Sequence, residues 1–263
     1  MNDFLKKIAG IKRGEVKAAR ARVSLNELKA ICRDLAPTRP FETALSGEGI
    51  ALIAEVKRAS PSAGIIRDRF DPAALARAYE KGGAAAVSVL TEENYFLGDL
   101  DHLRLVKKAV RLPVLRKDFI IDEYQIYQSR AAGADAILLI VELLDRERLG
   151  DFLAIARSLK LACLVEAHGK KDLEKAIAAE AAIIGVNNRD LKTLLVDLET
   201  SFNLLPLIPV GRLRVSESGI KTAADVSRLR AAGADAVLVG ETLLRDQDSA
   251  EKIKELTSCM SYL

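Results

Sequence analysis

Along most of the chain, short apolar runs alternate with longer stretches in which apolar and polar residues recur at helical spacing. The apolar runs are rich in Ala, Val, Ile and Leu, which predicts buried β-strands. Strands that are apolar along most of their length are typical of parallel sheets covered by helices. We expect strands at 51–57, 84–90, 112–116, 135–141, 161–166, 182–187, 212–217 and 235–239, and helices near 72–81, 99–110, 122–132, 145–159, 170–179, 197–205, 222–232 and 246–258.

An internal repeat supports this alternation. The segment RAAGADA occurs at 130–136 and again at 230–236, and an aliphatic run follows it both times. Two looser copies also occur, each with a helical pattern, a small-residue stop and a strand pattern. We expect Gly82, Gly133 and Gly233 to be helix C-caps with positive φ.

Eight strands that alternate with eight helices predict an α/β protein with a single (β/α)8 barrel. An open doubly wound sheet is the alternative, but its GxGxxG mark does not follow the first strand. Residues 3–20 have a basic amphipathic helical pattern, and Ser24 and Glu27 have the spacing of a capping box. We therefore divide the chain into an N-terminal helical extension, 1–48, and the barrel, 49–263. The extension could cover the barrel mouth or close its bottom.

Composition and charge narrow the function classes. The 263 residues carry a net charge of +3 and include no Trp, which argues against nucleic-acid binding. Cys32, Cys163 and Cys259 form no CxxC pair, which favours a reduced compartment. The N-terminal segment lacks a signal-peptide core, and no stretch has the roughly 18 apolar residues of a membrane span. We expect a cytoplasmic protein that binds neither nucleic acid nor membrane.

Charged side chains stand at the predicted C-terminal ends of several strands, where chemistry occurs in barrels of this type. Glu55 and Lys57 end the first strand, Lys117 follows the third, and Glu166 ends the fifth. Such a mixed set of acids and bases suits proton transfer if burial and pairing shift its pKa values. The alternative is an ion-pair network that merely closes the barrel.

The loops after the last two strands suggest a phosphate site. Ser218-Gly219 and Gly240-Glu241 each precede a helical pattern, and backbone N–H groups in such loops hold phosphate well. The glycines could instead serve only tight turns. The long loop 58–70 after the first strand has the length of a lid.

Aromatic residues near the mouth predict either a flat pocket for an aryl ring or ordinary packing. These are Tyr95, Phe96 and Phe119. The sequence has neither the spaced ligands of a metal site nor a Ser/His/Asp set. We interpret His168 as a solvated loop residue and Cys163 as a core residue.

Several motifs together resemble the indole-3-glycerol-phosphate synthase family over nearly the whole chain from about residue 45. They are IAEVKRASPSAG, VSVLTEENYFLGD, PVLRKDFIID, LLIVELL, LVEAH, IGVNNRDL, VSESGI and ADAVLVGETLL, in this order. The resemblance implies a (β/α)8 lyase of tryptophan biosynthesis that uses neither cofactor nor metal. It implies that 1-(2-carboxyphenylamino)-1-deoxyribulose 5-phosphate is converted to indole-3-glycerol phosphate, carbon dioxide and water.

The resemblance also implies roles for the charged residues. Lys117 matches the general acid of ring closure, and Glu166 matches the general base of the dehydration. Lys57 would hold the substrate carboxylate and can donate a proton to the departing hydroxide, while Glu55 would orient Lys57. The other matching positions are Asn187 and Ser218 for the substrate hydroxyls, Ser60, Arg189, Gly219, Gly240 and Glu241 for the phosphate, and Phe96, Phe119 and Leu138 for the aromatic ring.

One departure from the family pattern is the absence of any Trp. In some members the N-terminal extension places an aromatic residue over the ring. Phe4 could do so here. We expect a monomer whose partner is a small anionic phosphosugar substrate. Two alternatives are another phosphosugar enzyme on the same barrel, either an isomerase or an aldolase with a Schiff-base lysine, and a non-catalytic phosphometabolite-binding protein.

Overall fold

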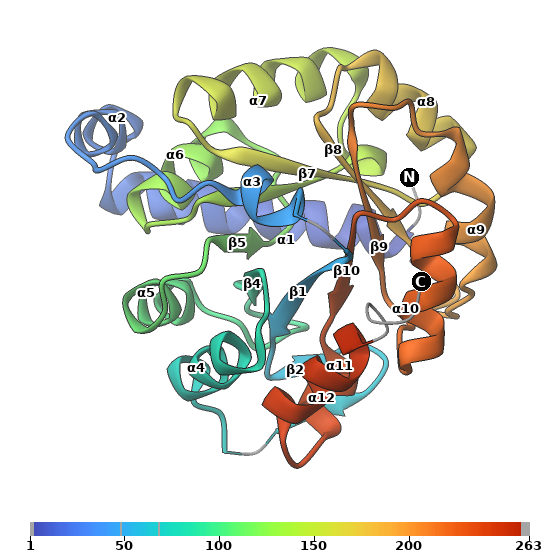
Figure 1. The fold of residues 1–263 in the computed structure, drawn as a ribbon. Helices are drawn as coiled ribbons and strands as arrows, with labels where there is room; N and C mark the ends of the chain where they lie inside the picture. The colour runs from blue at the N-terminus through green and yellow to red at the C-terminus, as the bar shows by residue number, and fades with distance from the viewer. Residues whose placement is uncertain (1–2, 48, 68, 259–263) are drawn as a thin grey trace.

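The computed structural model describes residues 3–47, 49–67 and 69–258. Eight parallel strands form a closed barrel (Figure 1), and β1 pairs with both β10 and β4 to close it. The predicted (β/α)8 barrel is therefore confirmed, and the open sheet is excluded. The barrel strands are β1 Ala51–Val56, β4 Ala86–Leu90, β5 Val114–Lys117, β6 Ala136–Ile140, β7 Ala162–Ala167, β8 Ile183–Asn187, β9 Leu213–Glu217 and β10 Ala236–Val239.

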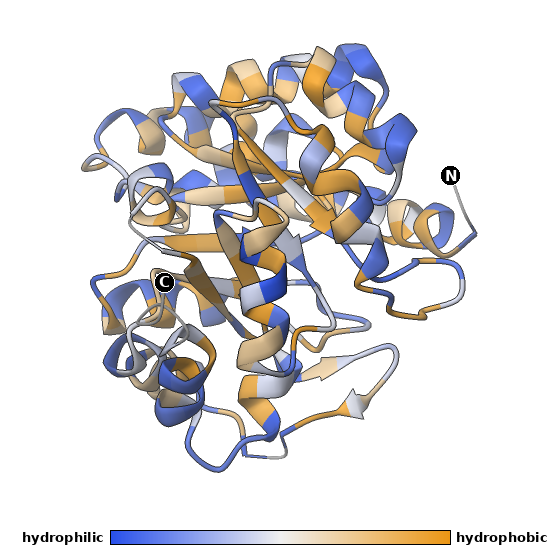
Figure 2. Cartoon of the chain, turned by 45° about the vertical axis from the view of Figure 1, so that its right-hand side comes forward, coloured by the Kyte–Doolittle hydropathy of each residue, from blue (hydrophilic) through white to orange (hydrophobic). Residues whose placement is uncertain are grey.

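A ring of helices surrounds the barrel, and each helix predicted after the first strand is present to within a few residues. The strands and the inward faces of these helices are mainly apolar, whereas polar residues face outward (Figure 2). The helices are α4 Pro72–Gly82, α5 Leu100–Ala109, α6 Glu123–Ala131, α7 Arg146–Ser158, α8 Lys170–Ala178, α9 Glu199–Leu204, α10 Ala223–Ala231, α11 Glu241–Arg245 and α12 Ser249–Thr257, with 3₁₀ turns η1 Val141–Leu143 and η2 Leu205–Leu207.

Alternation along each strand divides the core into two parts. On β1, Leu52 and Ala54 pack outward against the helices, whereas Ile53 packs inside the barrel. Successive side chains of a strand point to opposite faces, so the residue two positions after an interior apolar residue also points inward. At the C-terminal strand ends this rule brings polar side chains into the barrel mouth.

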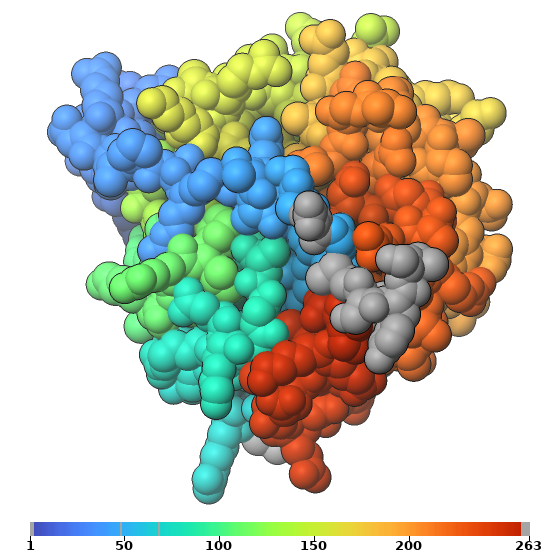
Figure 3. Space-filling model, viewed as in Figure 1, coloured from blue at the N-terminus to red at the C-terminus, as the bar shows by residue number. Residues whose placement is uncertain are grey.

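The extension consists of α1 Asp3–Arg22, α2 Leu25–Arg33 and α3 Phe41–Leu45. Helix α1 lies across the mouth, and its Lys12 pairs with Asp118 just beyond β5. The chain then crosses to the other end of the barrel, where the Arg39 N–H donates to Asp135, just before β6. In the view of Figure 1, α3 lies in front of the barrel and α1 behind it, and Figure 3 shows the segment that includes α3 (blue) across the near face.

The extension therefore does both things that the sequence left open, since α1 covers part of the mouth and α3 closes the bottom. Residue 48, where we placed the boundary, lies outside the described residues, as does Cys259. Within the parts of the chain that the structure describes, no helix is both long enough and apolar enough to cross a membrane.

The prediction for Gly82 is wrong by one residue. Gly133 and Gly233 have positive φ, as predicted, but at the end of α4 it is Gly83 that adopts φ +91°. Gly82 is the last helical residue, and a Cβ there would lie 2.8 Å from the Ala250 carbonyl oxygen. This glycine permits a close approach of α4 to α12.

Candidate active site

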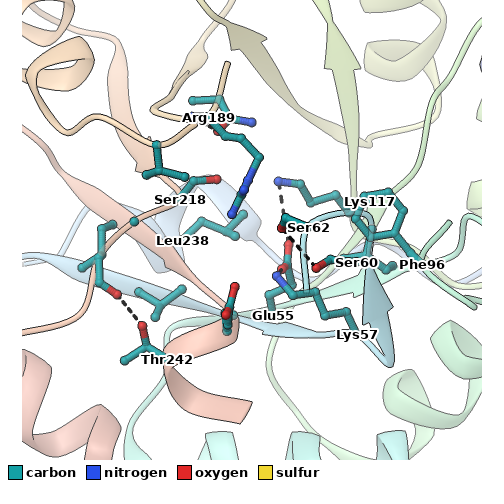
Figure 4. Close-up of a pocket in the computed structure, with 18 of the residues that line it drawn as sticks. Glu55, Lys57, Ser60, Ser62, Phe96, Lys117, Arg189, Ser218, Leu238 and Thr242 are labelled. Carbon is teal, nitrogen blue, oxygen red and sulfur yellow. Dashed lines mark hydrogen bonds and ion pairs between the residues drawn. The ribbon is translucent and has the colours of Figure 1, made fainter. Parts of the chain in front are cut away.

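A cavity of about 730 Å³ opens at the C-terminal ends of the barrel strands (Figure 4). Every residue to which the family resemblance assigned a catalytic, phosphate-binding or ring-binding role lines it, so the structure brings this set together. The set is Glu55, Lys57, Ser60, Phe96, Lys117, Phe119, Leu138, Glu166, Asn187, Arg189, Ser218, Gly219, Gly240 and Glu241.

Lys117 lies at the centre of the charged side chains. Its Nζ is 2.6 Å from a carboxylate oxygen of Glu217, 3.6 Å from Glu166 and 3.8 Å from Glu55. These carboxylates come from β9, β7 and β1, so the cluster exists only because the barrel closes. Its four side chains are at most 13% exposed.

Burial and charge act in opposite directions on the central pair. Burial lowers the pKa of Lys117, but the carboxylates of Glu217, Glu166 and Glu55 outweigh burial and hold this pKa above its usual value. Burial also raises the pKa of Glu217 to about 7, although the Lys117 ammonium opposes the shift. Lys117 is therefore a protonated group, and Glu217 can carry or release a proton near neutral pH.

Lys57 and Glu55 form a second pair at the edge of this cluster, with Nζ 2.6 Å from Oε1. Burial raises the pKa of Glu55, but Lys57 and Lys117 outweigh it, and the net pKa is lowered. Glu55 is thus an anion that faces two ammonium groups. The two side chains lie on the same face of β1, since they are two positions apart, and this places the acid and the base side by side at the barrel mouth.

Glu217 is the central residue that the proposed set lacked. It is fully buried beneath Lys117, and Gly185 on the neighbouring strand leaves room for it, because a Cβ there would clash with Glu217 Oε1. A signal was present in the sequence: Val215 is an interior residue, and Glu217 follows it by two positions. Glu217 is the last residue of β9, and its carboxylate points into the barrel.

The doublet Asn187-Asn188 divides between two tasks. Asn187 lines the cavity and accepts a hydrogen bond from the Arg189 N–H at 3.0 Å. Asn188 faces away, and its side-chain amide donates to the carbonyl oxygens of Glu217 and Ser218 at 2.9 and 3.0 Å. Asn188 therefore ties the end of β8 to the turn after β9.

His168 differs from its predicted environment. Its side chain is only 11% exposed, and Nε2 lies 3.4 Å from Glu166 Oε1. Burial lowers the pKa of His168, although Asp172 and other nearby carboxylates partly oppose the shift. The ring is therefore a neutral neighbour of Glu166 and not a solvated loop residue.

The loops after β9 and β10 form one end of the cavity. Ser218 and Gly219 both have positive φ, at +70° and +83°, and the Thr242 hydroxyl donates to the Ile220 carbonyl at 2.6 Å, joining the loops after β9 and β10. Arg189 reaches in from the loop after β8, opposite Lys57 and Ser60 (Figure 4). The carboxylate of Glu241 pairs with Arg245 at 2.8 Å.

The long first loop, placed beside this end, folds into a short hairpin of β2 Ala59–Ser60 and β3 Gly64–Ile65. The Ser60 hydroxyl accepts from the Ala63 N–H at 3.2 Å and faces the cavity. The hairpin thus forms part of the cavity wall.

Aromatic rings form an apolar wall. The rings of Phe96 and Phe119 are 6.4 Å apart, and Phe4 of α1 lies 6.4 Å from Phe119. Phe4 itself lines the cavity, whereas Tyr95 does not and instead packs edge-on against Phe4 at 5.3 Å. An aryl group could therefore lie against this wall, with the extension contributing one ring.

No group of three or more His, Cys, Asp or Glu side chains suited to a metal occurs among the residues that the structure describes. The arrangement combines fixed ammonium groups, carboxylates of differing proton affinity, an aromatic wall and an end that contains the Arg189 guanidinium. It can move protons to and from a ligand that has an aryl group at one end and an anion at the other.

Comparisons with known proteins agree with this geometry. The family model described as indole-3-glycerol phosphate synthase matches residues 5–256. An indole-3-glycerol phosphate synthase of Dehalococcoides mccartyi (strain CBDB1) is 50% identical over 247 residues, covering 92% of this chain and 95% of its own. That of Pelodictyon phaeoclathratiforme is 56% identical over 211 residues, covering 80% of this chain and 82% of its own.

Among solved structures, a 3-hexulose-6-phosphate synthase is similar with a TM-score of 0.63 at 17% identity, covering 80% of this chain and 99% of its own. A thiamine phosphate pyrophosphorylase from Pyrococcus furiosus has a TM-score of 0.59 at 16% identity, covering 80% of this chain and 95% of its own. At such low identity these similarities concern the fold alone.

Proposed function

The chain belongs to the indole-3-glycerol phosphate synthase family, and on that premise we propose how its side chains carry out the family's reaction. The family relationship expected from the motifs is confirmed. The activity is that of a carbon–carbon lyase of tryptophan biosynthesis. It closes the ring of 1-(2-carboxyphenylamino)-1-deoxyribulose 5-phosphate and removes carbon dioxide and water.

Ring closure needs an acid at the substrate carbonyl. The ring carbon that bears the carboxylate attacks this carbonyl, and the Lys117 ammonium donates a proton to its oxygen as the new C–C bond forms. Loss of carbon dioxide then returns the bonding electrons to the ring system. The cluster of Glu217, Glu166 and Glu55 around Lys117 is the observation that carries this proposal, because it keeps the acid protonated and fixed before substrate arrives.

Dehydration needs a base and a proton for the departing hydroxide. Glu166 removes a proton from the methylene carbon beside the nitrogen, and the neighbouring carbon, formerly the carbonyl, loses its hydroxide as water with a proton from Lys57. The short contact between Lys57 and Glu55 supports an orienting role for Glu55. A carboxylate beside the positively charged intermediate also lowers its energy. Lys57 holds the substrate carboxylate before that group is lost.

The two ends of the substrate provide the anchor. We assign the phosphate to the end formed by Ser60, Arg189, Gly219, Gly240 and the N–H of Glu241. Phe96, Phe119 and Leu138 form the pocket of the aryl ring, and Asn187 and Ser218 bind the hydroxyls between them. Fixing both ends brings the ring carbon to the carbonyl, an effect that contributes about 7–11 kcal/mol in favourable cases.

Turnover measurements on Lys117→Met and Glu166→Gln test these roles. The protein has no Trp, so the fluorescence of the indole product rises over a low background. Each variant should lower kcat by about 10²- to 10⁴-fold while circular dichroism shows an intact fold. Lys6→Met, in an exposed ion pair with Asp3, is the matched control. A variant that turned over at the control rate would lose its assigned role.

We also propose that the chain acts as a monomer in the cytoplasm, with residues 49–263 as the catalytic barrel. A cavity lined by one chain supports the monomer, and the free thiols of Cys32 and Cys163 support a reducing compartment. Light scattering after size-exclusion chromatography tests the oligomeric state, and the mass of a dimer would contradict the proposed monomer.

A further inference from the structure

Lys12 of helix α1 is a buried lysine outside the cavity. Its side chain is 2% exposed, and Nζ lies 2.7 Å from Asp118 and 2.7 Å from Glu15. An ammonium group is rarely removed from water unless it is paired. Burial lowers the pKa of Lys12, but Asp118 and Glu15 outweigh it and raise the pKa above its usual value. Lys12 is therefore a fixed cation between two carboxylates.

Asp118 connects Lys12 to the cavity wall. It lies between Lys117 and Phe119 in the sequence, and its carboxylate accepts the Phe119 N–H at 2.8 Å. It also pairs with Arg116 at 2.9 Å and accepts the Thr91 hydroxyl at 2.6 Å. Its side chain is fully buried, so these contacts define one geometry.

Glu15 connects the same lysine to a second loop of the mouth. Its other carboxylate oxygen accepts the Asn94 side-chain amide at 3.0 Å. Asn94 belongs to a turn organised by the fully buried Glu92, which accepts the N–H groups of Asn94, Tyr95 and Phe96 at 2.7–3.0 Å. This turn carries Phe96, a second aromatic residue of the wall.

We propose that Lys12 is a positioning residue that joins the loops after β4 and β5 and so fixes Lys117, Phe96 and Phe119 for the reaction. The two loops are adjacent. The loop after β5 follows Lys117 directly, and the two loops carry Phe96 and Phe119 of the aromatic wall. A displacement of about 1 Å in such groups can cost on the order of 10²-fold in rate. The inference rests on the proposed roles of Lys117 and of the aromatic wall.

Replacing Lys12 by methionine keeps the apolar stem and removes the cation. Lys12→Met should lower kcat/KM by about 10- to 100-fold. Hydrogen exchange should accelerate at 91–97 and 117–121 but not in the strands across the barrel. Lys12→Arg, which restores the charge, should recover part of the activity. Glu15→Gln is a milder second variant that should speed exchange at 91–97 alone and lower kcat/KM by about 3- to 10-fold.

Arg20→Met is the matched control, because Arg20 ties the same helix to Asp122 through a pair at 2.6 Å that does not reach the cavity wall. It should change kcat/KM by less than about twofold. The proposal is overturned if Lys12→Met keeps the control activity, or if Arg20→Met loses as much as Lys12→Met. It is also overturned if the exchange changes are spread over the whole barrel.

These outcomes are separate from those of the proposed roles. If Lys117→Met remained active, the assignment of Lys117 would fail, whereas the effect of Lys12→Met on exchange at 117–121 would still be measurable. If Lys117→Met were inactive but Lys12→Met retained full activity, only the positioning role would fail.

Discussion

The ammonium of Lys117 lies 2.6 Å from the carboxylate of Glu217, across the full width of the barrel mouth. Their strands, β5 and β9, are separated by three strands in either direction around the ring. No local sequence contact joins the two residues, and closure of the barrel alone sets their distance. The pair places a proton-holding carboxyl group directly behind the central acid.

Glu217→Gln should change how stability depends on pH. The pKa of Glu217 in the folded chain is about 7, above its usual value of 4.5, so the folded state binds this proton more tightly than the unfolded state. The resulting stabilisation is complete below about pH 4.5 and is lost as pH rises through about 7. Relative to the wild type, Glu217→Gln should therefore gain up to about 3 kcal/mol between about pH 5 and pH 8.

Urea denaturation at about pH 5 and about pH 8 measures the free energies of unfolding of the wild type and of Glu217→Gln. The exposed Glu174→Gln is the control. An offset between the wild type and Glu217→Gln that is the same at both pH values would show that Glu217 does not titrate in this range.

Phe4→Ala should raise KM more than it lowers kcat. Phe4 extends the aromatic wall but does not touch the charged cluster, so it contributes to substrate and transition-state binding alike. We expect KM to rise about tenfold, which corresponds to about 1.4 kcal/mol of lost aromatic contact. Steady-state kinetics measure the change. Phe202→Ala, which removes a ring that packs with Arg228 outside the barrel, should leave KM as it is.

Gly240→Ala should reduce activity with little effect on stability. A Cβ at this position would clash with Glu55 Oε1 and lie 3.0 Å from Lys57 Nζ, so the methyl group must displace the pair. The φ of Gly240 is negative, at −125°, so this position does not require the left-handed conformation that favours glycine. We expect kcat/KM to fall by about tenfold or more. Unchanged kinetics would mean that the pair tolerates displacement.

Gly82→Ala should have the opposite effect to Gly240→Ala, because it should lower stability and leave activity unchanged. Its Cβ would lie 2.8 Å from the carbonyl oxygen and 2.9 Å from the Cα of Ala250, which are backbone atoms that cannot move aside as a side-chain tip does. Overpacking of this kind costs about 1–3 kcal/mol, more than the better helix propensity of alanine returns. Thermal denaturation should show the loss while kcat/KM stays unchanged, and a variant as stable as the wild type would contradict the close approach of α4 to α12.

Much of the site could be predicted because its residues follow local rules. The strands were recognisable from apolar runs, and in a parallel barrel all strand ends meet at one mouth, so Lys117 and Glu166 could be assigned to it before any distance was known. The motifs further tied these positions to a family. Glu217 was not among the assigned residues, although it stands at the end of the predicted strand 212–217.

The tertiary structure decided which residues meet. Alternation states the side of a strand on which a residue lies, but partners across the barrel depend on closure and stagger, which are properties of all eight strands together. The contact of Glu217 with Lys117 arises in this way. The burial of Lys12 against Asp118 and the place of Phe4 on the cavity wall depend on how a remote helix docks, and the pattern of that helix alone does not encode where it docks.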